Sequence, residues 1–174
     1  GKTDCFSSMS FDGSYNKNKH YYNAEKTITL GLIFNPENEI YSNQNLRKAI
    51  AYSIDKEAVK KEINSDISVA YGIIPSGIKL LGQSYRELSD HSAFSCYNKD
   101  EAVRFFKRAK KELAIESLRS EKILVSTSSL NSKYLHILSQ QWQELFGYYI
   151  GVEEVSDKEF YSRLESGKYS IALY

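Results

Sequence analysis

The sequence predicts an α/β fold, with an α+β arrangement as the alternative, on the basis of three observations. From Glu121 to the end, strand and helix patterns alternate as β-α-β-α-β with short connections, which favours helices packed on a mainly parallel or mixed sheet. Two amphipathic helix patterns follow each other directly across residues 43–63. The 174 residues fit a single domain (1–174), which buries about 70 % of its unfolded surface and needs no disulfide or metal to fold.

Composition argues against several classes of function. Lys and Arg total 23 and Asp and Glu total 22, so the net charge of +1 gives no electrostatic reason to expect binding to nucleic acid or to an anionic membrane. No apolar run approaches the roughly eighteen residues of a membrane span, and the first residues lack a signal-peptide pattern. We therefore expect the chain as given to be soluble.

Cysteine and histidine patterns indicate no metal site. The three histidines are scattered, and Cys5 and Cys96 have no metal-binding spacing. The cysteines are either two separate thiols or one long-range disulfide, which would require Cα atoms within about 7 Å of each other. We expect no metal and no cofactor.

The first predicted elements are a surface loop and a strand. The Asn-, Lys- and Tyr-rich stretch that ends at Asn23 is typical of a loop. Thr27–Phe34 (TITLGLIF) is β-branched and apolar and is followed by Asn35-Pro36, which predicts a strand. Its nearly continuous apolar character predicts burial on both faces.

The helix pair at residues 43–63 comes next. Leu46, Ile50 and Ile54 recur at the helical period and form a face that is predicted to be core. Asp55 interrupts this pattern as an N-cap, because its carboxylate can accept from backbone N–H groups two or three residues further on. A second apolar stripe then begins at Val59.

A long connection and a third helix follow. Asn64–Tyr97 has no sustained period, so we expect it to wrap over the surface, with a short helix near Ser84–Leu88. Asn98 and Glu101 have the spacing of a reciprocal capping box. The helix that they introduce carries a basic side, which we expect to be solvated, and a core stripe made of Ala102, Phe106, Ala109 and Leu113.

The last third contains three strands. Ile123–Thr127 and Tyr169–Tyr174 are predicted strands, and Tyr148, Ile150 and Val152 alternate as a third strand between them.

Two helices separate these strands. The first is capped by Ser129 or Asn131 and ends before Gly147, and the second begins with a capping box of Ser156 and Glu159. The first helix carries an apolar stripe of Leu135, Leu138, Trp142 and Leu145, and the second carries Phe160 and Leu164 before it ends at Gly167. Because Trp142 is in phase with the leucines, it is predicted to be a core anchor rather than a platform for a ligand.

Catalytic chemistry has no support in the sequence. It contains no phosphate-binding glycine loop, no nucleophile elbow and no Cys/His pairing, and no spacing pairs its carboxylates for acid–base work. We expect no enzyme activity.

Several runs resemble the family 5 solute-binding proteins, the oligopeptide and dipeptide receptors of ABC importers. Residues 33–63 (IFNPENEIYSNQNLRKAIAYSIDKEAVKKEI) are similar to the signature region of that family. The matching positions are Asn35, Arg47, Lys48, Ala49, Ile50, Ala51 and Asp55. VAYGIIPSG, YNKDEAVRFFKRAKKEL and the stretch from Trp142 to the end also resemble family segments.

The resemblance implies a lobe of the type II periplasmic-binding-protein fold, with a mixed sheet flanked by helices. Gly1–Phe6 (GKTDCF) resembles the strand by which the chain enters the second, C-terminal lobe, and GKYSIALY resembles the strand by which it leaves. Ser170 departs from the family pattern, in which an Asp is usual. Residues 1–174 would then be the second lobe, bounded by the inter-lobe crossovers, of an extracellular or periplasmic protein that is anchored as a lipoprotein when complete.

The implied function is capture of peptides, or of a related solute, by hinge closure of two lobes and delivery to a membrane ABC permease. Its partners would be the solute, the first lobe and the permease, and we expect a monomer. The alternative is the solute-sensing domain of a regulatory or signalling protein with the same fold. Ligand-binding residues are expected near the crossovers and at one strand end: Ser7, Ser8, Met9, Ser10, Asn35 and Tyr174. Arg47 and Asp55 are expected to be structural.

Overall fold

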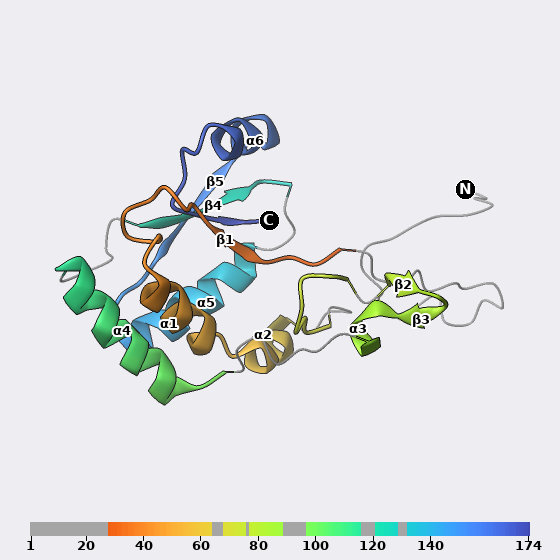
Figure 1. Cartoon of the computed structure of the whole chain (residues 1–174). Helices are drawn as coiled ribbons and strands as arrows, with labels where there is room; N and C mark the ends of the chain where they lie inside the picture. The colour runs from red at the N-terminus through yellow and green to blue at the C-terminus, as the bar shows by residue number, and fades with distance from the viewer. Residues whose placement is uncertain (1–27, 64–67, 76, 89–96, 116–120, 129–131) are drawn as a thin grey trace.

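The computed structural model describes residues 28–63, 68–75, 77–88, 97–115, 121–128 and 132–174 (Figure 1). The strands are β1 (Leu32–Phe34), β2 (Lys79–Leu80), β3 (Gln83–Ser84), β4 (Lys122–Ser126), β5 (Gly151–Val155) and β6 (Ile171–Leu173). The helices are α1 (Gln44–Ser53), α2 (Lys56–Ile63), α3 (Tyr85–Leu88), α4 (Lys99–Leu113), α5 (Ser132–Phe146) and α6 (Asp157–Glu165). The loop before Asn23, both cysteines and the proposed caps Ser129 and Asn131 lie outside the described residues.

Four strands form one mixed sheet in the order β1-β6-β4-β5. β4 pairs in parallel with β5 and β6, whereas β1 runs antiparallel to β6 at one edge. The register pairs Leu32 with Leu173 and Phe34 with Ile171. The predicted mixed sheet is therefore confirmed, and its three parallel strands belong to the β-α-β-α-β stretch at the end of the chain.

Helices cover both faces of this sheet (Figure 1). Along β4, Ile123 and Val125 join the core cluster that includes residues of α1, α4 and α5, whereas Leu124 joins Phe160 of α6 on the opposite face. This alternation follows from the two-residue period of a strand. The result is a three-layer α/β arrangement, as predicted.

Trp142 is the anchor of the larger cluster, as the periodicity of α5 predicted. Its side chain is fully buried, and its Nε1 donates to Ser53 Oγ at 2.8 Å. The Ser53 hydroxyl in turn donates to the Ile50 carbonyl at 2.7 Å. The indole N–H is thus satisfied inside the core, which removes the usual penalty for burying a polar group.

The helix pair has the predicted break. α1 ends at Ser53 and α2 begins at Lys56, with Asp55 between them. Asp55 Oδ1 accepts from the Ala58 N–H at 2.9 Å, so the N-cap is confirmed. Arg47 donates to the carbonyls of Tyr41 and Ser42, which agrees with a structural role.

The cap of α4 differs in part from the prediction. Asn98 Oδ1 accepts from the Glu101 N–H at 3.1 Å, as expected. The reciprocal half is wrong, because the Asn98 N–H donates to the Tyr52 carbonyl at 2.9 Å and the Glu101 carboxylate pairs with Arg104. The contact with the end of α1 therefore replaces the second bond of the capping box.

The prediction of a strand across Thr27–Phe34 that is buried on both faces is wrong in extent and in burial. The ladder spans only Leu32–Phe34, and Ile28 and Leu30 are exposed. β1 lies at the edge of the sheet, so one side of its backbone is open and its side chains are only half-buried.

The connection after α2 contains a hairpin that the sequence analysis did not predict. β2 and β3 pair antiparallel across Leu81 and Gly82, which have φ of 52° and 84°. Positive φ at both central residues is characteristic of a tight type I′ hairpin turn. α3 follows at once and confirms the short helix predicted near Ser84–Leu88.

Candidate ligand-binding site

The carboxyl ends of the parallel strands define the first candidate site. β4, β5 and β6 run in the same direction, so Ser126, Val155 and Leu173 end at the same edge of the sheet. Open α/β sheets bind their ligands outside this edge, because the loops and helix N-termini that follow the strands meet there. We call it the carboxyl edge.

A small polar network joins the ends of β4 and β5 at the carboxyl edge. The Ser126 hydroxyl donates to Asp157 Oδ1, lies 3.0 Å from the Ser128 hydroxyl and accepts from the Ser128 N–H at 3.2 Å. Hydrogen bonds from Ser126 and then Ser128 hold the pKa of the Asp157 carboxyl below its usual range. Asp157 also stands in the first turn of α6, where the helix dipole favours a negative charge.

This network presents an ionised acceptor to solvent. Such a group can receive N–H donors or an ammonium group from a ligand. Among the described residues, the hydrogen-bond partners of the Ser126 side chain are Asp157 and Ser128. The arrangement therefore offers a site for a ligand that carries hydrogen-bond donors.

Tyr174 also lies at the carboxyl edge. Its backbone N–H donates to the Gly31 carbonyl at 2.9 Å, and the Gly31 N–H donates to the Tyr174 carbonyl at 2.7 Å. Its side chain is 58 % exposed. The backbone is thus fixed while the side chain remains accessible, which is compatible with the predicted ligand contact.

Asn35 lies at the opposite end of the same strand pair, beside Ser170. Its side chain is buried, and Nδ2 donates to the carbonyls of Gly167 at 2.8 Å and Tyr169 at 2.9 Å. Oδ1 accepts from the Glu37 N–H at 3.0 Å. The side chain therefore holds the end of β1 against the start of β6, and the structure does not bring Asn35 and Tyr174 together.

The other predicted ligand residues are not placed. Ser7, Ser8, Met9 and Ser10 lie outside the described residues. Sequence analysis missed Asp157 and Ser128 as candidates. The available signal was the polar run after the buried strand at residues 123–125, since polar residues that follow a buried parallel strand gather at the carboxyl edge.

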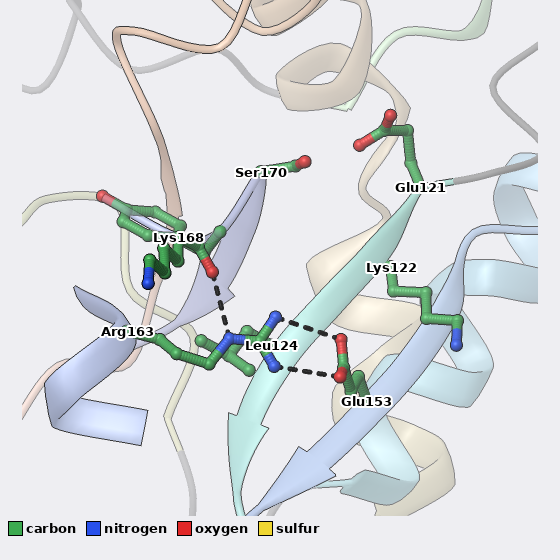
Figure 2. Close-up of a pocket in the computed structure, with 8 residues that line it drawn as sticks. Glu121, Lys122, Leu124, Glu153, Arg163, Lys168 and Ser170 are labelled. Atoms are coloured by element: carbon green, nitrogen blue, oxygen red, sulfur yellow. Dashed lines mark hydrogen bonds and ion pairs between the residues drawn. The ribbon is translucent and has the colours of Figure 1, made fainter. Parts of the chain in front are cut away.

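Two surface pockets lie at the other edge of the sheet, where β4 and β6 begin. The larger has a volume of about 510 Å³ and is lined by Glu121, Lys122, Leu124, Glu153, Arg163, Lys168, Tyr169 and Ser170 (Figure 2). The smaller, about 290 Å³, lies beside Asn35 and is lined by Pro36, Glu37, Leu164, Glu165, Ser166, Gly167 and Tyr169 as well.

Two charged side chains of the larger pocket, Arg163 and Glu153, are bonded to each other. Arg163 donates to both carboxylate oxygens of Glu153, at 2.9 and 3.2 Å, and its Nε donates to the Lys168 carbonyl at 3.0 Å (Figure 2). The hydrogen bonds between the two side chains lower the pKa of Glu153 and raise that of Arg163. The pair joins α6 to β5, so we interpret this pocket as structural.

The part of the chain that the structure describes holds no group of three or more His, Cys, Asp or Glu residues that could bind a metal ion. Likewise, no helix in these ranges is long and apolar enough to cross a membrane.

Fold and carboxyl edge together define the structural class: an α/β domain whose mixed sheet presents a ligand-binding edge. The chain belongs to the bacterial extracellular solute-binding proteins, family 5 (Middle), whose family model matches residues 7–174. The family consists of binding proteins that act outside the cytoplasm. No curated protein sequence matches the chain significantly.

Solved structures have the same fold. The substrate-binding domain of an oligopeptide ABC transporter from Bacillus anthracis str. Ames has a TM-score of 0.77 and 22 % identity, covering 92 % of this chain. The pheromone receptor PrgZ, described with its mode of peptide binding, has a TM-score of 0.74 and 25 % identity over 91 % of this chain. The chain spans 32 % of the length of each of these two proteins.

A third structure is that of a peptide-binding protein of a peptide ABC transporter. Its TM-score is 0.71 and its identity 26 %, and the match covers 87 % of this chain and 67 % of that protein. These structures confirm the predicted fold, a type II periplasmic-binding-protein lobe.

Proposed function

We propose that this chain is the second, C-terminal lobe of a receptor that captures peptides outside the cytoplasm and delivers them to an ABC permease. The observation that carries this proposal is the family 5 match over residues 7–174. Two similar structures at 25 and 26 % identity, PrgZ and the peptide-binding protein, are described as binding peptides. The complete receptor would be a monomer, anchored to the membrane as a lipoprotein.

The carboxyl edge supplies this lobe's half of the ligand site. The Tyr174 side chain and the Asp157 carboxylate are exposed there, and the first lobe would close over them. A peptide offers N–H donors, carbonyl acceptors and a terminal ammonium, which suit main-chain hydrogen bonds and one ionised acceptor. Ser7, Ser8, Met9 and Ser10 are proposed to complete this half. The Asn35 amide is already bonded within the lobe, so a ligand contact by Asn35 requires that one of these three bonds be displaced.

Calorimetric titration tests the proposal. A peptide library is titrated into the 174-residue chain and into the full-length receptor that contains it. We expect binding to the receptor and weak or undetectable binding to the lobe, because one half of the cleft is missing from it. Sub-micromolar binding to the lobe alone would contradict the divided cleft, and absence of binding to the receptor would contradict the peptide ligand.

Substitution of two similarly exposed tyrosines tests whether the carboxyl edge contacts the peptide. Tyr174 at the carboxyl edge and Tyr161 on α6 are 58 % and 52 % exposed. Tyr174→Ala in the receptor is expected to weaken peptide binding by about tenfold, a loss typical of a buried aromatic contact. Tyr161→Ala is expected to leave affinity unchanged, and equal effects of the two variants would place the ligand elsewhere.

A further inference from the structure

Residues 68–75 and 77–88, which we call the hairpin module, expose an unusual concentration of apolar side chains. None of these residues is buried. The module holds eight of the fourteen large hydrophobic side chains that are exposed among the described residues: Tyr71, Ile73, Ile74, Ile78, Leu80, Leu81, Tyr85 and Leu88. Ile73 is 74 % exposed and Leu81 98 %. Soluble proteins seldom leave such clusters uncovered, and they mark interaction sites.

The module is attached to the lobe through polar contacts at its base. Lys56 of α2 donates to the Ala70 carbonyl at 3.0 Å and lies 5.3 Å from the centre of the Tyr71 ring. The Tyr71 hydroxyl donates to Glu57 at 3.0 Å. Within the module, Arg86 Nε donates to the Ile74 carbonyl at 3.0 Å. These bonds are polar, and the eight large apolar side chains of the module remain exposed beside them.

Leu81 at the tip of the hairpin is unfavourable for local reasons. It has a φ of 52° and is followed by Gly82 at 84°. Asn, Asp or Gly is favoured at this turn position, because other residues rarely adopt the left-handed conformation. The sequence places there a leucine that is also almost fully exposed. A residue that is unfavourable for both backbone and solvent points to a role for this side chain beyond the turn itself.

We propose that the hairpin module docks on another part of the same receptor and that Leu81 inserts into an apolar recess of that part. The inference rests on the proposed function, which makes this chain one lobe of a longer protein. The two similar structures that match 92 % and 91 % of this chain are about three times as long, since the chain covers 32 % of each. In Figure 1 the module projects away from α4 and α6, on the side toward which residues 28–31 run.

The informative variant is Leu81→Asn. Asparagine tolerates the left-handed conformation and removes the apolar tip, so it favours the turn while it disfavours docking. Tyr161→Asn is the matched control, because it removes an exposed aromatic side chain from α6, outside the module. Both variants are made in the 174-residue chain and in the full-length receptor.

Hydrogen exchange at residues 79–84 is the measurement. We expect the wild-type hairpin to exchange about tenfold more slowly in the receptor than in the 174-residue chain, because docking must open before exchange. Leu81→Asn should abolish this difference without accelerating exchange in the 174-residue chain, and Tyr161→Asn should preserve it. Equal exchange of the wild-type hairpin in both proteins, or full protection in the Leu81→Asn receptor, would overturn the proposal.

Two further measurements separate the remaining outcomes. If light scattering shows that the 174-residue chain is a dimer and that Leu81→Asn makes it a monomer, the occupant is a second copy and the proposal is overturned. Peptide titration of the same receptor distinguishes this inference from the proposed function. A protected hairpin without peptide binding would refute the function alone, and peptide binding with an unprotected hairpin would refute the docking alone.

Discussion

Replacing Asn35 tests whether its side chain contacts the ligand or instead joins the end of β1 to the start of β6. The Asn35 amide makes three hydrogen bonds, at 2.8, 2.9 and 3.0 Å, to Gly167, Tyr169 and Glu37. Since each such bond contributes about 0.5–1.5 kcal/mol, Asn35→Ala is expected to lower the free energy of unfolding by about 2–4 kcal/mol. For a domain of this size, that loss corresponds to a fall in Tm of roughly 5–15 °C.

The assay is chemical denaturation of the 174-residue chain, with Asn35→Asp as a second variant. Aspartate retains the acceptor for the Glu37 N–H but places a carboxylate against two carbonyl oxygens. It should therefore destabilise at least as strongly as alanine. Asn45→Ala is the control, because Asn45 lies within α1 and, among the described residues, its side chain bonds the exposed Glu112 alone. The free energy of unfolding of this variant should change by less than about 0.5 kcal/mol.

Peptide binding by the Asn35→Ala receptor, measured beside its stability, distinguishes the two roles. If Asn35→Ala leaves the denaturation midpoint unchanged but abolishes peptide binding by the receptor, Asn35 contacts the ligand and the structural interpretation is refuted. If the midpoint falls and affinity persists in the folded variant, the side chain serves only to join β1 to the start of β6.

Two more predictions concern the N-cap of α2 and the ion pair between Arg163 of α6 and Glu153 of β5. Asp55→Ala should lower stability by about 1 kcal/mol through loss of the bond to the Ala58 N–H, whereas an unchanged midpoint would reject the cap. The pKa of Glu153 is lowered in the folded state by its bonds to Arg163, so the stability it contributes is present above the ordinary value of 4.5 and is lost as the pH falls below it. Denaturation midpoints between pH 3 and 6 should therefore fall less steeply for Glu153→Gln than for the wild type, and parallel profiles would contradict this assignment.

Periodicity and capping chemistry predicted much of the fold. The stripe of Leu46 and Ile50, the Asp55 cap and the position of Trp142 depend on neighbours within one or two helical turns, so a single sequence contains the necessary information. The apolar run that ends at Phe34 was misleading, because a strand at the sheet edge and a strand buried on both faces can have the same composition. The hairpin at Leu81 escaped prediction because its turn lacks the Asn-Gly or Asp-Gly signal.

The candidate site was harder to predict than the fold, because it depends on strand direction. Asn35 is predicted to bind ligand because it ends a strand in the sequence, and Tyr174 because it stands at the exit crossover. β1 is antiparallel to β6, however, so the end of β1 lies beside the start of β6, far from Tyr174. The residues that follow β4, β5 and β6 meet at the carboxyl edge, beside the start of β1, which among the described residues brings Ser128, Asp157 and Tyr174 to one edge. The pairing of strands, which no local pattern specifies, therefore decides which polar residues can act on one ligand.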